Sequence, residues 1–170
     1  MFKLLLPDHD FETFDLITPE FLKSIGKKYL LCDLDNTLVA YDVAEPDEKV
    51  ANWVRRMTES GIKLVIISNN EKDRVESFCK DLGTPFLYKA GKPSKKTVRN
   101  ALALVGGNRE ECAVAGDQLL TDVVTARISK VTPIWVKTIK RVDRPFFRFK
   151  DAVEKPFKKY YFKHKKTEKK

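Results

Sequence analysis

The sequence predicts an α/β protein: a three-layer α/β/α, Rossmann-like domain built around a parallel sheet of five strands. Short apolar runs alternate along the chain with segments of helical periodicity, and strands that are separated by helices must run parallel. The length of 170 residues fits one domain, and 42% apolar residues are enough to build its core. Polar side chains follow several of the apolar runs, which is where parallel sheets bind ligands.

The predicted strands are short runs rich in apolar and β-branched residues. They cover residues 29–33, 62–68, 85–88, 112–116 and 133–136. Before them, residues 1–27 form an entry segment in which Thr18 and Pro19 favour the start of a helix.

Apolar residues recur at helical spacing between these strands. The helix predicted over residues 47–60 buries Val50 and Met57 and ends before Gly61, a residue typical of helix ends. The same periodicity predicts further helices over residues 71–82, 94–105 and 122–129.

The positive charge of the chain lies mostly at its C-terminal end. Residues 144–170 carry 11 basic and 3 acidic side chains, so this segment holds +8 of the net charge of +9. The same segment contains 7 of the 18 aromatic residues. The sequence therefore divides into a nearly neutral domain, residues 1–143, and a basic, aromatic-rich C-terminal tail, residues 144–170.

Composition excludes several classes of protein. Three cysteines without CxxC spacing make neither a disulfide framework nor a zinc finger, and the two histidines lie far apart. The apolar runs are much shorter than the roughly 18 residues that span a membrane. The first of them stops at Pro7, too early for a secretory signal. We therefore expect a soluble protein of a reducing compartment, the cytoplasm.

Acidic side chains follow two of the predicted strands. Asp33 and Asp35 come at the end of the first strand, and Asp117 and Asp122 follow the fourth. Carboxylates gathered at one edge of a sheet repel each other unless a cation lies between them. Oxygen ligands without a nearby histidine or cysteine suit a hard cation, so we expect Mg²⁺ as the cofactor.

Two further polar segments complete the pattern: Ser68-Asn69-Asn70 after the second strand, and Gly91-Lys92-Pro93 before the fourth. A carboxylate can attack phosphorus and form an aspartyl-phosphate. A metal ion and a lysine can offset the charge of the phosphoryl group, while hydroxyl and N–H groups hold its oxygens. Each segment alone is also an ordinary turn, but four of them in order at strand ends indicate phosphoryl transfer.

The four segments, in this order over residues 33–122, resemble the motifs of the haloacid dehalogenase (HAD) superfamily of phosphatases. The DLDNTL, GKP and GDQLLTD segments resemble more narrowly subfamily IIIA and its YqeG family, and this likeness extends over residues 1–140. The resemblance implies the HAD fold and Mg²⁺-dependent hydrolysis of phosphomonoesters through an aspartyl-phosphate.

The resemblance also implies a role for each matching residue. Asp33 would be the nucleophile and a metal ligand. Asp35 would be the general acid and then the general base, and its backbone carbonyl would also meet the metal. Asp117 would be a metal ligand, and Asp122 would either bind the metal or orient the groups that bind it. The other catalytic positions would be Thr37, Ser68 and Lys92, and the substrate-binding positions Asn36, Ser68, Asn69 and Lys92.

The chain leaves no room for the cap domain that many superfamily members insert over the site. Only one helix and one strand are predicted between Thr37 and Ser68, and again between Ser68 and Lys92. An open site suits a large substrate, which can cover the site itself. Because the YqeG family is similar to phosphatases of phosphatidylglycerophosphate, this lipid is the leading substrate hypothesis. A soluble sugar or nucleotide phosphate, with a neighbouring subunit as the lid, is the alternative.

The tail leaves three interpretations open. Helical spacing puts Phe146, Phe149 and Phe157 on one stripe among basic residues, as in helices that lie on anionic membranes, which would place the protein at the inner face of the membrane. The same composition serves nucleic acid, so an RNA- or ribosome-associated protein is a second interpretation. In the third, the aromatic half packs on the domain. Pro145 suits a helix start, whereas Pro156 predicts a kink or a break.

Overall fold

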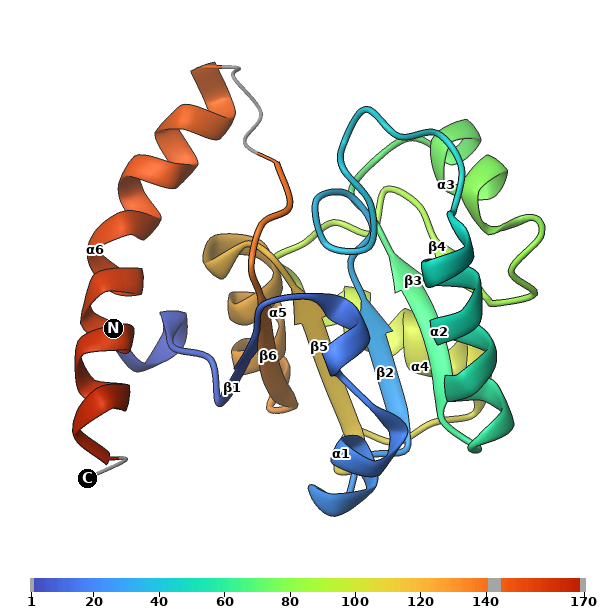
Figure 1. Cartoon of the computed structure of the whole chain (residues 1–170), viewed down its shortest axis with the longest axis horizontal. Helices are drawn as coiled ribbons and strands as arrows, with labels where there is room; N and C mark the ends of the chain where they lie inside the picture. The colour runs from blue at the N-terminus through green and yellow to red at the C-terminus, as the bar shows by residue number, and fades with distance from the viewer. Residues whose placement is uncertain (1, 141–144, 169–170) are drawn as a thin grey trace.

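The computed structural model describes residues 2–140 and 145–168, and within them one parallel sheet of six strands forms the centre of the molecule (Figure 1). The strands are β1 (His9–Phe11), β2 (Tyr29–Cys32), β3 (Lys63–Ile67), β4 (Phe86–Leu87), β5 (Cys112–Gly116) and β6 (Thr132–Val136). Their order is β1-β6-β5-β2-β3-β4, and every neighbouring pair is parallel. The central strand β2 therefore has β3 on one side and β5 on the other.

Helices cover both faces of this sheet. The α-helices are α1 (Pro19–Ser24), α2 (Glu48–Glu59), α3 (Lys72–Cys79), α4 (Lys95–Val105), α5 (Val124–Ser129) and α6 (Pro145–Glu168). Three short turns of helix are η1 (Phe2–Leu5), η2 (Phe14–Leu16) and η3 (Leu119–Val123), the last of them π-helical. Side chains of α1, α2 and α3 pack on one face, and those of α4 and α5 on the other. The predicted three-layer architecture is confirmed.

Successive residues of β2 pack into different layers. Leu30 and Cys32 belong to the cluster that holds Trp53 of α2 and Phe78 of α3, whereas Leu31 packs against α4 and α5 on the opposite face. A parallel strand that is buried on both faces needs apolar side chains at every position. This requirement explains the continuous apolar run from which the strand was predicted.

The predicted number of five strands is wrong, because β1 adds a sixth at the edge of the sheet. β1 pairs with β6, and His9 lies opposite Ile134. All three residues of β1 are half-buried and they contain no apolar run, so no periodic pattern marks the strand. Long-range contacts fix it instead: the Asp8 N–H donates to the Pro133 carbonyl at 3.0 Å, and Arg127 Nη2 pairs with the Asp8 carboxylate at 2.6 Å.

The helix α6 lies beside the β1–β6 side of the sheet (Figure 1). Phe157 packs against the cluster that contains Leu119 and Trp135, and the Tyr161 hydroxyl donates to a carboxylate oxygen of Asp10 at 2.8 Å. The helix α6 continues through Pro156 without a break, although Figure 1 shows that it is bowed. Tertiary contacts such as those of Phe157 and Tyr161 thus help to hold one long helix where the local sequence predicts a kink or a break.

Two of the predictions for the tail fall outside the described residues: the boundary between residues 143 and 144, and the side chain of Phe146. Among the helices that are described, none combines the length and the apolar character that crossing a membrane requires.

Candidate active site

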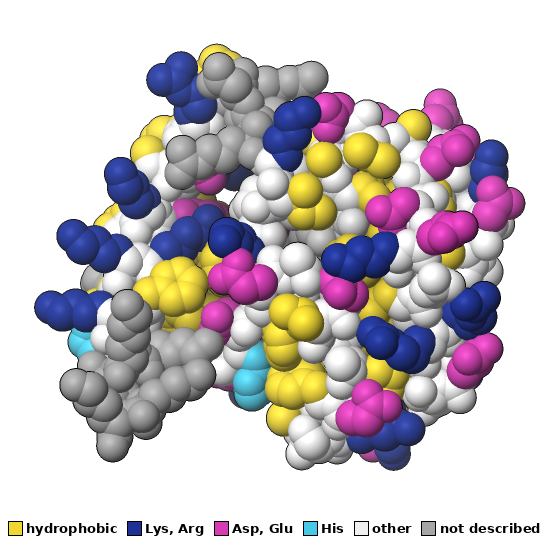
Figure 2. All heavy atoms as spheres, in the orientation of Figure 1, with side chains coloured by type: hydrophobic (Ala, Val, Ile, Leu, Met, Phe, Trp, Pro, Cys, Tyr) yellow, Lys and Arg dark blue, Asp and Glu magenta, His cyan; other side chains and the backbone are white. Residues whose placement is uncertain are grey.

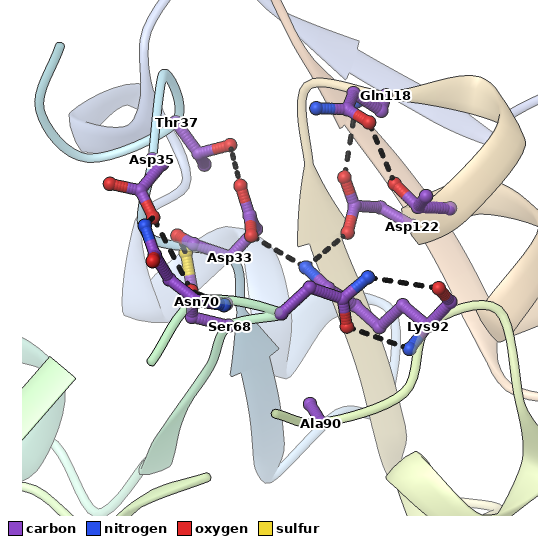
Figure 3. A network of polar contacts seen from close by, with 12 residues as sticks. Asp33, Asp35, Thr37, Ser68, Asn70, Ala90, Lys92, Gln118 and Asp122 are labelled. Atoms are coloured by element: carbon purple, nitrogen blue, oxygen red, sulfur yellow. Dashed lines mark hydrogen bonds and ion pairs between the residues drawn. The ribbon is translucent and has the colours of Figure 1, made fainter. Parts of the chain in front are cut away.

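The predicted site residues meet at the carboxyl ends of β2, β3 and β5. Asp33, Ser68 and Asp117 each directly follow one of these strands, and the loop before α4 brings in Lys92. Because the loop after β2 leads toward α2 on one face of the sheet and the loop after β5 leads toward α5 on the other, the loops diverge there and leave a crevice between them. Figure 3 shows the side chains of Asp33, Lys92 and Asp122 pointing toward one another there.

Lys92 joins two carboxylates at the bottom of this crevice. Its Nζ lies 2.5 Å from Asp33 Oδ1 and 2.7 Å from Asp122 Oδ1, and all three residues are buried. The Thr37 hydroxyl donates to the other oxygen of Asp33 at 3.0 Å. Burial alone would lower the pKa of Lys92, but Asp122 and Asp33 hold that pKa above its ordinary value. The ammonium group therefore stays charged.

Opposing effects act on the pKa of Asp33. Burial raises its pKa, Lys92 lowers it, and Asp122 raises it again, which leaves the pKa at about 7. A carboxylate that is poorly solvated but held by a lysine and a hydroxyl is well suited to attack an electrophile.

Asp117 completes a cluster of three buried acids. Carboxylate oxygens of Asp33, Asp117 and Asp122 all lie within 4.8 Å of one another. Asp117 Oδ1 is buried and has no hydrogen-bond partner among the described residues. Burial, and then the charges of Asp33 and Asp122, raise the pKa of Asp117 well above its usual range. One lysine does not balance three acids, so the donor set fits a hard divalent cation such as Mg²⁺.

The backbone of β5 determines where Asp122 lies. A Cβ atom on Gly116 would fall 2.2 Å from Asp122 Cγ, so only glycine allows the carboxylate to pack against the strand. The Gln118 N–H then donates to Asp122 Oδ2 at 3.1 Å. We refer to the buried set Asp33, Lys92, Asp117 and Asp122 as the carboxylate floor.

Asp35 lies apart from this floor, and its side chain contacts other groups. Arg74 on α3 donates to Asp35 Oδ1 through Nε at 3.3 Å and through Nη2 at 3.0 Å. The Ser68 hydroxyl and the Asn70 amide each donate to Oδ2 at 3.3 Å. The side chain of Asp35 is therefore not in the cluster of possible metal ligands, and its predicted metal contact through the backbone carbonyl stays a prediction.

The side chains of Asn69 and Asn36 form hydrogen bonds with backbone groups of the loops around the site. The Asn69 amide donates to the Lys92 carbonyl at 2.9 Å, and the Lys92 N–H donates to the Asn69 side-chain oxygen at 2.8 Å. Asn36 has a φ of 65°, which asparagine tolerates better than most residues, and its side chain accepts from the Tyr41 N–H at 3.2 Å. Both asparagines also line the cavity.

The cavity above the floor has a volume of about 430 Å³. Its lining includes six of the nine residues expected to act there, and the three that do not line it are Thr37, Asp117 and Asp122. Seven lining residues had no assigned role: Tyr41, Asn70, Pro93, Gln118, Leu120, Thr121 and Lys150. Asn70 directly follows Ser68 and Asn69, and its place in this polar segment could have marked it as a site residue. No nearby sequence pattern marks Arg74 or Lys150 as a site residue. Each lies on a helix, and its partner at the site, Asp35 for Arg74 and Gln118 for Lys150, is far away along the chain.

The comparisons with known proteins agree with this geometry. Residues 8–128 match the family described as haloacid dehalogenase-like hydrolase. Over 153 residues the chain is 40% identical to the probable phosphatase YqeG of Bacillus subtilis (strain 168), and the alignment covers 90% of this chain and 89% of that protein.

Solved structures share the fold at lower identity. The cobalt-bound deoxy-D-mannose-octulosonate 8-phosphate phosphatase of Haemophilus influenzae has a TM-score of 0.52 and 12% identity, over 78% of this chain and 90% of that one. The 3-deoxy-D-manno-octulosonate 8-phosphate phosphatase of Moraxella catarrhalis, in complex with magnesium, phosphate and KDO, has a TM-score of 0.50 and 16% identity, over 85% and 98%. The predicted resemblance is thus confirmed: the chain belongs to the haloacid dehalogenase-like hydrolase family, and it is a phosphatase.

Proposed function

We propose that this phosphatase hydrolyses phosphomonoesters in two steps through a phosphorylated Asp33. The observation that carries the proposal is the carboxylate floor, in which Asp33 is buried against Lys92, while one oxygen of Asp117 finds no hydrogen-bond partner in the described part of the chain. Asp33, Asp117 and Asp122 would hold Mg²⁺, which, when bound, would offset the negative charge of the phosphoryl group and the acids around it.

In the first step, an oxygen of Asp33 bonds to phosphorus while the bond from phosphorus to the ester oxygen breaks. Asp35 gives its proton to the departing oxygen, and Lys92 offsets the charge on the phosphorylated aspartate. In the second step, Asp35 takes a proton from water as the water oxygen attacks phosphorus. The bond to Asp33 breaks, inorganic phosphate leaves, and both side chains return to their starting states.

The proposed natural substrate is a lipid phosphomonoester, phosphatidylglycerophosphate, which would give phosphatidylglycerol. Support comes from a cavity that no cap covers within the described residues, so that a headgroup could enter from a membrane surface. Exposed basic residues on α6 add support, and Figure 2 shows Lys and Arg side chains along the outer side of this helix. Phe149 on the same helix is 67% exposed.

The reaction can be tested with purified protein and a panel of phosphomonoesters. We expect Asp33→Asn to lower kcat about a thousandfold or more for every substrate, because an amide cannot form the phosphorylated intermediate. Chelation with EDTA should abolish phosphate release, and Mg²⁺ should restore it. Hydrolysis by a folded Asp33→Asn protein at the wild-type rate would contradict the mechanism.

The lipid assignment needs a separate test with vesicles that contain phosphatidylglycerophosphate. Removing the whole tail would also remove Phe157 from the cluster that contains Leu119 and Trp135, so point substitutions are more informative. We expect the double substitution Lys155→Glu and Lys159→Glu to weaken sedimentation with anionic vesicles about tenfold or more, since each exposed lysine contributes about 1 kcal/mol at such a surface.

The same double substitution should not change the hydrolysis of a soluble phosphate ester. Preferred turnover of a soluble sugar or nucleotide phosphate would instead favour the alternative substrate class. Salt-dependent binding of RNA that the double substitution removes would favour the RNA-associated alternative.

A further inference from the structure

The helix α6 supplies part of the wall of the active-site cavity. Lys150 lines the cavity next to Gln118, Leu120 and Thr121, which follow β5. Its Nζ donates to Gln118 Oε1 at 2.9 Å, and the Thr121 hydroxyl donates to the same oxygen at 3.2 Å. A basic side chain from the C-terminal tail thus reaches the residue that directly follows Asp117.

Buried polar contacts fix this part of α6. The Leu120 N–H donates to Glu154 Oε1 at 2.9 Å, and Lys158 Nζ lies 2.8 Å from Glu154 Oε2. Glu154 is only 1% exposed, and it lies one helical turn after Lys150. Lys158 also lies over the ring of Trp135, 5.6 Å from its centre, and the Trp135 indole donates to the Asp117 carbonyl at 2.7 Å. The position of Lys150 is therefore tied to the backbone of the catalytic loop.

The two lysines in the cavity lie in different surroundings. Lys92 is buried and forms ion pairs with two acids of the carboxylate floor, so its charge serves the transferred phosphoryl group. Lys150 lies in the wall, half-buried, beside a neutral amide oxygen. An anionic group in the leaving portion of a substrate would meet the acids Asp33 and Asp35 in the same cavity. A cation in the wall would offset that repulsion.

We propose that Lys150 binds a second anionic group, a phosphodiester or a carboxylate, in the leaving portion of the phosphomonoester. This inference rests on the proposed function, because it assumes that the phosphomonoester itself reacts at Asp33. It extends that function by naming what the enzyme selects: substrates with a second negative charge on the side of β5 and α6. A lipid headgroup and a soluble metabolite can both carry such a group.

The test compares two soluble substrates that differ in this group. Glycerol phosphate has a neutral leaving portion, and glycerophosphoglycerol phosphate carries a phosphodiester there. We expect Lys150→Met to lower kcat/KM for the second substrate about tenfold or more, mainly through KM, and to lower it much less for glycerol phosphate. Lys150→Arg should retain most of the preference because it keeps the charge.

Lys163→Met is the matched control, because this lysine is exposed on the same helix and does not line the cavity. It should leave kcat/KM for both soluble substrates at the wild-type value. Thermal unfolding of all three variants would establish that α6 stays docked. An equal loss for the two substrates in a folded Lys150→Met protein would overturn the proposal, as would full activity of that variant on the phosphodiester substrate.

Failure of the proposed function gives a different result, since neither substrate would then be hydrolysed in a manner that requires Asp33. A second arm identifies the source of the anion. If vesicle-bound phosphatidylglycerophosphate is preferred over its deacylated headgroup and Lys150→Met lowers kcat/KM for both, the phosphodiester belongs to a lipid. A preference for the soluble headgroup, with the same loss for both substrates in Lys150→Met, supports the role of Lys150 and assigns the group to a soluble metabolite.

Discussion

The carboxylate floor and the α6 wall of the cavity are held in place by different means. On the floor, Lys92 and its two partner acids are buried and joined by short ion pairs, so each charge depends on the others. In the wall, Lys150 is half-buried and its bond to Gln118 involves a neutral oxygen. Removing one member of a buried ionic set costs far more than changing a partly exposed contact.

This difference separates two effects of substitution. A change on the floor should affect the chemical step for every substrate, because all substrates react at Asp33. A change in the wall should affect the choice of substrate, because Lys150 would contact only the leaving portion.

The most disruptive small change is Gly116→Ala. The added methyl group would fall 2.2 Å from Asp122 Cγ, so Asp122 or β5 must move, and the pair between Asp122 and Lys92 must open. We expect kcat to fall about a hundredfold or more, and the free energy of unfolding to fall by about 1–3 kcal/mol. Assays of phosphate release and thermal unfolding measure the two effects.

The control for this change is Gly106→Ala at the end of α4. Gly106 has a φ of 63° and no atom within 4 Å of an added Cβ, so the substitution strains the backbone without displacing a neighbour. It should cost about 1 kcal/mol of stability and leave kcat unchanged. If both variants lost the same stability and both kept their activity, the packing of Asp122 on Gly116 would not matter for catalysis.

Asp117→Asn should remove most of the activity without lowering the stability of the protein. In EDTA the variant should be as stable as the wild type or melt roughly 2–4 °C higher, because the amide removes repulsion from Asp33 and Asp122 and can donate to them. The rise in melting temperature on adding Mg²⁺ should be largely lost, and activity with it. Differential scanning calorimetry with and without Mg²⁺ measures these shifts, and a full Mg²⁺-dependent rise in the variant would contradict the assignment of Asp117 as a ligand.

The floor was predictable because each of its members stands next to a recognisable element. Asp33 and Asp117 follow apolar runs that could only be buried strands, and parallel strands end at one edge of the sheet. Lys92 lies between a predicted strand and a predicted helix. Local sequence therefore determined both the element and the residue that ends it, and topology alone brought the residues together.

The wall and the sheet edge were not predictable in this way. β1 is only three residues long and is held by contacts to Pro133 and Arg127. Lys150 belongs to a basic helix, and its sequence pattern is equally consistent with a membrane or nucleic-acid surface. Tertiary contacts show which face of that helix turns inward, among them the buried acceptor Glu154, which binds the Leu120 N–H. Such a pairing, 34 residues apart, has no local signature.

Arg74→Lys tests a group that belongs to neither the floor nor the wall. Arg74 holds Asp35 Oδ1 through two nitrogen atoms and donates through Nη1 to the Ala44 carbonyl at 2.9 Å, and a lysine cannot reproduce this planar geometry. We expect kcat to fall about tenfold for alkyl phosphates, whose departing oxygen needs the proton of Asp35. The fall should be smaller for p-nitrophenyl phosphate, whose leaving group needs no proton. A uniform loss for both substrates would mean that Arg74 serves the structure of the loop alone.

Glu154→Gln should have the smallest effect and the most selective one. The amide keeps an oxygen for the Leu120 N–H but loses the charge that pairs with Lys158, so the free energy of unfolding should fall by about 1–2 kcal/mol. Because α6 would dock less firmly, KM for glycerophosphoglycerol phosphate should rise about threefold, while kcat for glycerol phosphate should not change. Trp135, which contacts both Lys158 and the Asp117 carbonyl, would report the loosening through its fluorescence. A fall in kcat for both substrates would show that the wall also positions the floor, and the separation between binding and chemistry would then be lost.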